Sequence, residues 1–187
     1  MALLDRMKGI LLEPKNEWPK IAAETATPQS IYVNWVCIFA AIGPLALLLV
    51  GGASGGAKFA VGTYIMALVI TFILALLIDA LAPSFGGTKD FVAALKLSAY
   101  SYTAAWIAGI FNLIGMLGAI LALLAAIYSW YTFYLGAPVL KKCAAEKAVP
   151  YTIIIVLCGI GLGLLFSFAL AGLGFVPRMG GLAMATR

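Results

Sequence analysis

The sequence has no histidine, only three cysteines and few charged residues. Histidine is the commonest general base and metal ligand, so its absence excludes a Ser–His dyad and the usual zinc sites. The cysteines, Cys37, Cys143 and Cys158, form no CxxC pair. Charged residues make up 10% of the 187 residues, against about 25% in a soluble domain. These deficits exclude a soluble enzyme and a secreted disulfide scaffold.

Apolar residues are abundant instead. They make up 64% of the chain, and the mean hydropathy is +1.09. A chain this short cannot bury so much apolar surface in a water-soluble core, which indicates that lipid surrounds most of the protein. The net charge of +5 comes from twelve basic residues that are scattered rather than clustered, so no nucleic-acid partner is expected.

Five long apolar runs predict an all-α, polytopic membrane bundle with five transmembrane helices. A spanning helix needs roughly 20 mostly apolar residues. A kink is expected at Pro44, inside the first run. The predicted spans are Ile31–Val50, Phe59–Leu81, Leu97–Leu113, Gly115–Val139 and Tyr151–Val176.

The first 30 residues form the one substantial polar stretch. Apolar residues recur there at helical spacing between Asp5, Arg6 and Lys8, which predicts a short amphipathic helix on the membrane surface, ended by Pro14. We therefore divide the chain into an interfacial N-terminal segment (1–30), a five-helix domain (31–176) and a short outer tail (177–187).

Basic residues favour one orientation of these spans. With five spans, nine basic residues lie on one side and three on the other, which predicts a cytoplasmic N-terminus and an outer C-terminus. The nine are Arg6, Lys8, Lys15, Lys20, Lys89, Lys96, Lys141, Lys142 and Lys147, and the three are Lys58, Arg178 and Arg187.

Three stretches, taken in order, resemble the bacterial members of the Yip1-domain family. The first is a leader with a proline, an aromatic residue and a basic-flanked isoleucine, at Leu11–Pro28. The second is a glycine turn followed by a helix that ends in an aromatic residue, at Phe85–Trp106. The third is an aromatic-rich helix end that meets a Gly-x-Pro and a lysine loop, at Tyr128–Thr152. The likeness runs from about Leu11 to about Leu157.

The resemblance implies a small integral membrane protein with a cytoplasmic N-terminus. Together with the five spans and the basic residues, this predicts an inner-membrane protein with a periplasmic C-terminus. Eukaryotic relatives bind Rab-type GTPases in vesicle trafficking. This chain has Pro83 to Gly87 where those relatives carry Asp-Leu-Tyr-Gly-Pro, and its cytosolic N-terminal segment is short. The family supplies no catalytic residues to carry over, and we expect neither enzymatic activity nor a cofactor.

Aromatic residues gather at the predicted cytoplasmic ends of the spans, whereas ordinary aromatic belts occupy both interfaces. They either anchor the protein or line a surface that binds a lipid headgroup or a partner, together with the ends of spans one and three. The lysines could equally form a plain positive-inside loop. The candidate surface consists of Tyr128, Trp130, Tyr131, Tyr134, Lys141 and Lys142.

Two further features lie within the spans. Gly159, Gly163 and Ser167 recur every four residues, a pattern that lets helices approach closely, either within the bundle or in a homo-oligomer. Asp79 is the acid nearest a span interior. It is either functional or an interfacial residue paired with Lys89 or Lys96.

The function predicted from these features is non-enzymatic. The protein is expected to organise the membrane, or to bind membrane lipids or a protein partner at its cytoplasmic face. The alternative is a small transporter, channel or lipid-translocating protein, for which the chain offers a few polar residues: Asn34, Thr63, Thr71, Asp79, Ser98, Ser101, Thr103 and Asn112.

Overall fold

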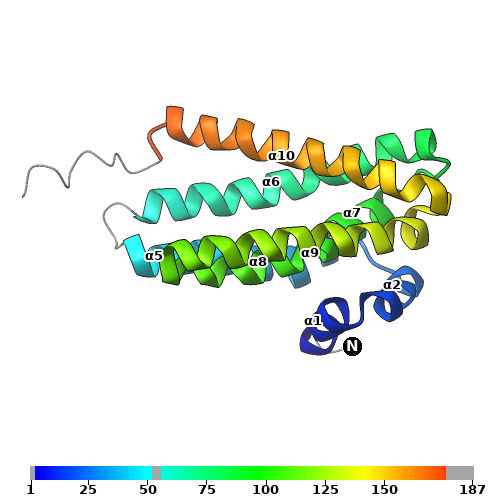
Figure 1. The fold of residues 1–187 in the computed structure, drawn as a ribbon, viewed down its shortest axis with the longest axis horizontal. Helices are drawn as coiled ribbons and strands as arrows, with labels where there is room; N and C mark the ends of the chain where they lie inside the picture. The colour runs from blue at the N-terminus through cyan, green and yellow to red at the C-terminus, as the bar shows by residue number, and fades with distance from the viewer. Residues whose placement is uncertain (1–2, 52–55, 176–187) are drawn as a thin grey trace, which may run out of the picture.

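The computed structural model describes residues 3–51 and 56–175, and every regular element in these ranges is helical. The predicted tail at 177–187 lies outside the described residues. Figure 1 shows the long helices running side by side, with α1 and α2 beside one end. The elements are α1 (Leu3–Leu12), α2 (Pro14–Ala23), α3 (Pro28–Ile31), η1 (Tyr32–Val36), α4 (Cys37–Ala40), α5 (Ile42–Gly51), α6 (Ala57–Leu81), η3 (Ala82–Phe85), α7 (Phe91–Ser101), α8 (Thr103–Ala108), η4 (Gly109–Ile114), α9 (Gly115–Lys141), η5 (Ala145–Lys147) and α10 (Ala148–Gly172).

Four continuous helical segments of the described chain are long and apolar enough to cross a membrane. They are Pro28–Val50, Ala57–Phe85, Phe91–Lys141 and Ala145–Gly172. The third has 51 residues, and a straight helix of that length would be about 76 Å long. It reverses direction at Gly115, whose φ of 58° is in the left-handed region that favours glycine, and α9 then packs back along α7 and α8.

Helix ends agree closely with the sequence for two of the five predicted spans and differ for the other three, including the fifth, where α10 runs Ala148–Gly172 instead of Tyr151–Val176. The second and fourth predicted spans match α6 and α9 to within two residues. The third was predicted to begin at Leu97, but α7 begins at Phe91. The Asp90 side chain accepts a hydrogen bond from the Ala93 amide at 3.0 Å and so caps this helix. Lys96 does not mark a span end, because it is buried inside α7.

The first predicted span is broken into four pieces. It contains the π-helix η1, and a turn at Ala41 separates α4 from α5. The interruption therefore lies three residues before Pro44, the expected position of the kink. Just after this turn, α5 packs closely against η4, because a Cβ added at Gly109 of η4 would lie 2.6 Å from the Cα of Gly43 in α5. Only glycine allows the two backbones to approach this closely.

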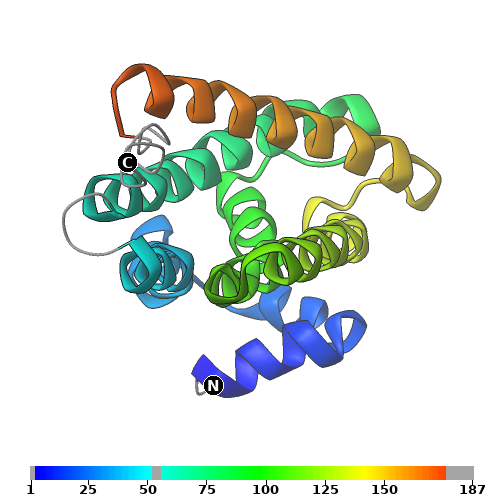
Figure 2. The same cartoon turned by 60° about the vertical axis from the view of Figure 1, so that its left-hand side comes forward.

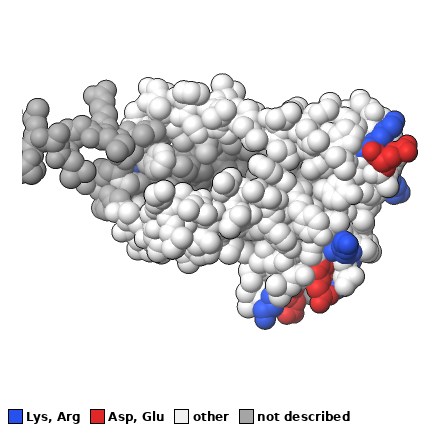
Figure 3. All heavy atoms as spheres, in the orientation of Figure 1, with Lys and Arg blue, Asp and Glu red and all other residues white. Residues whose placement is uncertain are grey.

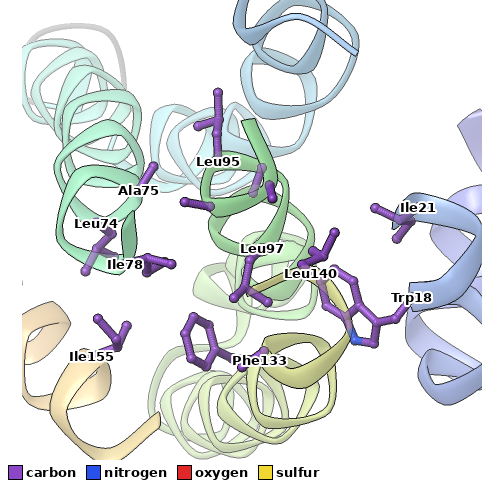
Figure 4. Close-up of a cluster of buried hydrophobic side chains, with 14 of the residues drawn as sticks. Trp18, Ile21, Leu74, Ala75, Ile78, Leu95, Leu97, Phe133, Leu140 and Ile155 are labelled. Carbon is purple, nitrogen blue, oxygen red and sulfur yellow. The ribbon is translucent and has the colours of Figure 1, made fainter. Parts of the chain in front are cut away.

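Packing is uneven along the bundle. Buried apolar residues gather at the end where α6 and α9 finish and α7 and α10 begin, among them Leu97, Phe133 and Ile155 (Figure 4). The opposite half of α9 exposes Met116, Leu117 and its apolar neighbours, as expected of a surface that faces lipid.

Charged residues are also distributed unevenly along the bundle. Figure 3 shows Lys, Arg, Asp and Glu gathered at the well-packed end and over α1 and α2, with an uncharged surface along the rest of the bundle in that view. We call this the charged end. Figure 2 shows α1 and α2 outside the bundle of long helices, along one side of it.

Candidate functional site

A cavity of about 570 Å³ lies at the charged end, between α1, the segment that links α2 to α3, the beginning of the first span, and α7. Its position at the junction of polar and apolar surface is where a membrane protein meets lipid headgroups. The lining residues are Leu3, Arg6, Glu24, Thr25, Ala26, Ser30, Ile31, Asn34, Trp35, Ile38 and Tyr100.

Trp18 holds the wall of this cavity in place. Its side chain is fully buried between α2 and the bundle, and its indole N–H donates to the carbonyl oxygen of Thr132 at 3.0 Å (Figure 4). A Cβ added at Gly136 would lie 2.5 Å from the indole ring, so the ring occupies the space that this glycine leaves. Tyr128 adds a second tie, donating its hydroxyl hydrogen to the carbonyl oxygen of Leu11 at 2.7 Å.

A buried charge network joins α1 to α2. The Arg6 guanidinium donates to Glu17 at 2.8 Å and also binds Glu24, while Lys20 binds the second oxygen of Glu17 at 2.9 Å. Arg6 and Glu17 are 5% and 3% exposed, so each needs the other to offset its desolvation. The charge of Arg6 is thereby fixed at the cavity wall.

Lys96 supports the segment that links α2 to α3. Its ammonium reaches the carbonyl oxygens of Ile21, at 2.8 Å, and of Glu24. Carbonyls at the C-terminal end of a helix lack partners and favour a cation, so Lys96 stabilises the end of α2. Behind this segment lies a second cavity of about 430 Å³, whose lining includes Glu24, Asp90, Lys96 and Lys142.

The inner side of the first cavity is aromatic. The rings of Trp35 and Tyr100 are 4.6 Å apart, and the Trp35 N–H donates to the Thr103 hydroxyl at 3.0 Å. Trp35 lies in η1, and short π-helices of this kind are frequent at functional sites. Asn34 is exposed and Tyr100 is half-buried, and both line the cavity, where their polar groups can meet a ligand.

The aromatic surface predicted from the sequence is only partly exposed. Tyr131 is 44% and Tyr134 36% exposed, and Lys142 is exposed as well. Trp130 is half-buried, as is Tyr128, which is engaged with α1.

Lys141 is fully buried and cannot offer its charge to a headgroup. Its ammonium donates to the Asp79 carboxylate at 2.7 Å and to the Asp90 carbonyl oxygen at 2.9 Å. Including Lys141 in the candidate surface was therefore wrong. The partner of Asp79 is this lysine, rather than Lys89 or Lys96. Asp79 also accepts the Asp90 backbone N–H at 2.7 Å, so it connects the ends of α6 and α9 to the start of α7.

The small-residue stripe of α10 has little to pack against among the described residues. A Cβ at Gly159 would lie 3.0 Å from the Tyr102 hydroxyl, but one at Gly163 would meet no atom of the described residues within 4 Å. Ser167 is exposed and donates to the Gly163 carbonyl oxygen at 2.7 Å. Close packing inside the bundle therefore involves Gly159 and not Gly163.

No group of three or more Cys, Asp or Glu side chains among the described residues converges as metal ligands would. Burial raises the pKa of the Cys143 thiol, which keeps it protonated and unreactive at neutral pH. What the first cavity can do is bind, because it combines charges of both signs with aromatic faces.

None of the six residues of the aromatic surface predicted from the sequence lines this cavity, and its charged residues were not predicted as a site either. The one-sided aromatics pointed to the ends of spans one and three, where Trp35 and Tyr100 lie. Arg6 and Glu24 were not predicted as site residues, because the contacts of Arg6 join separate segments. Arg6 lies in α1, whereas its partners Glu17 and Glu24 lie in α2 and just after it. The available signal was the composition of the first 30 residues, where four acidic residues, Glu17 and Glu24 among them, balance four basic ones.

The sequence model of the Yip1 domain matches residues 8–178. The chain belongs to the Yip1 domain family. No curated protein and no solved structure is similar enough to count as a match.

The match places the cavity almost wholly inside the Yip1 domain. It begins at Lys8, within α1, and continues through α2 and the linking segment into the first span. Only Leu3 and Arg6, among the lining residues, precede it. The division predicted at residue 30 crosses the matched range and stays a prediction.

Proposed function

We propose that this Yip1-domain protein is a non-enzymatic, five-span protein of the inner membrane that binds phospholipid headgroups at the first cavity. The observation that carries the proposal is the cavity itself. It holds Arg6, Glu24, Trp35 and Tyr100 where the charged end meets the lipid-facing surface. Its volume of about 570 Å³ is within the roughly 300–1,000 Å³ typical of small-molecule sites.

Five membrane crossings explain the length of the third apolar segment better than four crossings do. A hydrocarbon core is about 30 Å thick, so a 51-residue helical segment exceeds one crossing more than twofold. Its reversal at Gly115 divides it into Phe91–Ile114 and α9, each long enough for one crossing. The N-terminal α1 then lies at the interface with Leu4 and Leu12 turned outward.

The orientation rests on basic residues. The charged end carries most of them, and the positive-inside rule places such an end in the cytoplasm. The first cavity then opens at the cytoplasmic leaflet, whose headgroups are its nearest ligands.

The transporter alternative has less support. Ser98 donates to the Thr71 carbonyl oxygen at 3.2 Å, and Thr103 receives the Trp35 N–H, so these polar residues serve helix contacts. Neither residue lines the first or the second cavity. A continuous polar path would need such groups to face open space.

The test fills the cavity from its exposed rim. Asn34→Phe should remove most tightly bound phospholipid, because the added ring takes the space of a headgroup. Val33→Phe is the matched control, since Val33 is 58% exposed and does not line the cavity. Native mass spectrometry of protein washed in mild detergent would count the bound lipids. Equal retention by the two variants would contradict lipid binding here, and a co-purified protein lost from Asn34→Phe alone would favour a protein partner instead.

A further inference from the structure

The first cavity is lined by one fixed positive and one fixed negative group, Arg6 and Glu24. Arg6 already faces two carboxylates, Glu17 behind it and Glu24 beside it. A purely anionic ligand would therefore approach a guanidinium whose charge is compensated, with a carboxylate next to it. Such a ligand gains little from this arrangement.

We infer that the cavity selects a zwitterionic phospholipid headgroup that carries a phosphate and a primary ammonium, of the phosphoethanolamine type. The inference rests on the proposed lipid-binding function and specifies its ligand. A headgroup with both charges can place its phosphate against Arg6 and its ammonium against Glu24.

Arg6 retains donors for the phosphate. A guanidinium has five N–H groups, and the two ion pairs of Arg6 each use one of its terminal nitrogens. Its remaining N–H groups have no partner within the described residues, and the Asn34 amide lies on the same cavity wall. Arginine binds phosphate strongly because its planar donors match the phosphate oxygens.

Glu24 retains an acceptor for the ammonium. One carboxylate oxygen binds Arg6, and in the described chain the other accepts no hydrogen bond. The side chain is 46% exposed, so a ligand can reach it. The ring of Tyr100, which is half-buried and lines the same cavity, adds attraction, because a cation within about 6 Å of an aromatic ring is stabilised by its quadrupole.

The experiment offers the detergent-solubilised full-length protein an equimolar mixture of phosphatidylethanolamine and phosphatidylglycerol with identical acyl chains. Native mass spectrometry then gives the ratio of the two bound lipids. We expect wild type to enrich phosphatidylethanolamine roughly fivefold, the effect of one partly exposed ion pair. Glu24→Gln keeps the size and a contact to Arg6, and it should bring the ratio close to one. Glu13→Gln changes an exposed carboxylate that does not line the cavity and should keep the wild-type ratio.

The outcomes separate this inference from the function on which it rests. If Asn34→Phe loses lipid but wild type binds both lipids equally, or prefers phosphatidylglycerol, the cavity binds headgroups and the inference is wrong. If Asn34→Phe changes nothing, both fail. If Glu13→Gln abolishes the preference as Glu24→Gln does, the selectivity is a general surface-charge effect and the inference fails. A water-soluble phosphoethanolamine that displaces the enriched lipid would identify the headgroup, rather than the acyl chains, as the recognised part.

Discussion

Two adjacent lysines at the end of α9 have opposite environments. Lys141 is fully buried against Asp79, whereas Lys142 is exposed and takes a left-handed backbone conformation with φ of 54°. The left-handed residue ends α9, and the turn it makes directs the Lys142 side chain outward. Neighbouring identical residues thus serve the interior and the surface.

Removing the charge of Lys141 should destabilise the fold. Lys141→Met preserves side-chain bulk but leaves the Asp79 carboxylate, 21% exposed, without its cation. We expect the free energy of unfolding to fall by about 2–3 kcal/mol, somewhat less than for a completely buried pair. Lys142→Met, at an exposed position, should change it by less than about 0.5 kcal/mol. Denaturation in detergent measures both.

A double variant identifies the cause of this loss. Asp79→Asn combined with Lys141→Met removes the uncompensated charge and should recover part of the stability. Equal losses in the two single lysine variants would contradict the structure at this position.

At the scale of elements, Trp18 is the largest side chain by which the N-terminal helix pair is buried against the bundle, and hydrogen bonds from Tyr128 and Lys96 add to it. Trp18 fills the space above Gly136 and donates to Thr132, while Arg6 and Glu17 hold α1 to α2. The pair touches the bundle on one side only (Figure 2), so it can separate without unfolding the long helices.

Trp18→Ala should release α1 and α2 before the bundle unfolds. Replacing a buried tryptophan by alanine costs about 3–5 kcal/mol, and most of that loss falls on this contact. Limited proteolysis should cut the linking segment near Thr25 faster in the variant, while the long helices stay protected. Leu12→Ala, at a residue 77% exposed, is the control and should leave the rate unchanged. Identical cleavage of the two variants would mean that another contact holds the pair.

The elements also mark what a sequence can and cannot predict. The sequence predicts the ends of α6 and α9 to within two residues, because a helix that crosses the bilayer needs a long run of apolar residues, and such a run can be recognised from neighbouring residues alone. The docking of Trp18 onto Thr132 was not predicted, since no local pattern encodes a contact 114 residues away. For the same reason Lys141 could not be told from Lys142. Their burial depends on how α6 and α9 meet.

For the whole molecule, the unequal distribution of charge is the basis of the proposed orientation. The charged end and α1–α2 lie on one side of the apolar surface (Figure 3), and residues of α1 and of the segment after α2 line the first cavity. In the opposite orientation, the basic residues of this end, including Arg6 and Lys141 with their buried ion pairs, would lie on the outer side of the membrane, against the positive-inside rule.

Reporter fusions test this orientation. A reporter active only outside the cytoplasm should be silent when fused at Ala145, in the loop between α9 and α10, because that loop carries Lys141, Lys142 and Lys147. The same reporter fused after Arg187 should be active if the spans number five. Activity at Ala145 would reverse the orientation, and silence at both sites would indicate an even number of crossings.

The long separation between Trp18 and Thr132 also sets an order of events during synthesis. At about 5–20 residues per second, residue 132 is made roughly 6–23 s after residue 18. Helices α1 and α2 thus leave the ribosome well before α9 and reach their partner there only after it has been made. During that interval these helices cannot bury Trp18, the Arg6–Glu17 pair or the apolar face of α1 against the bundle. The membrane surface is the nearest boundary between apolar and polar surroundings where these groups can lie. The beginning of the chain therefore docks as a closing step, after α9 has been inserted.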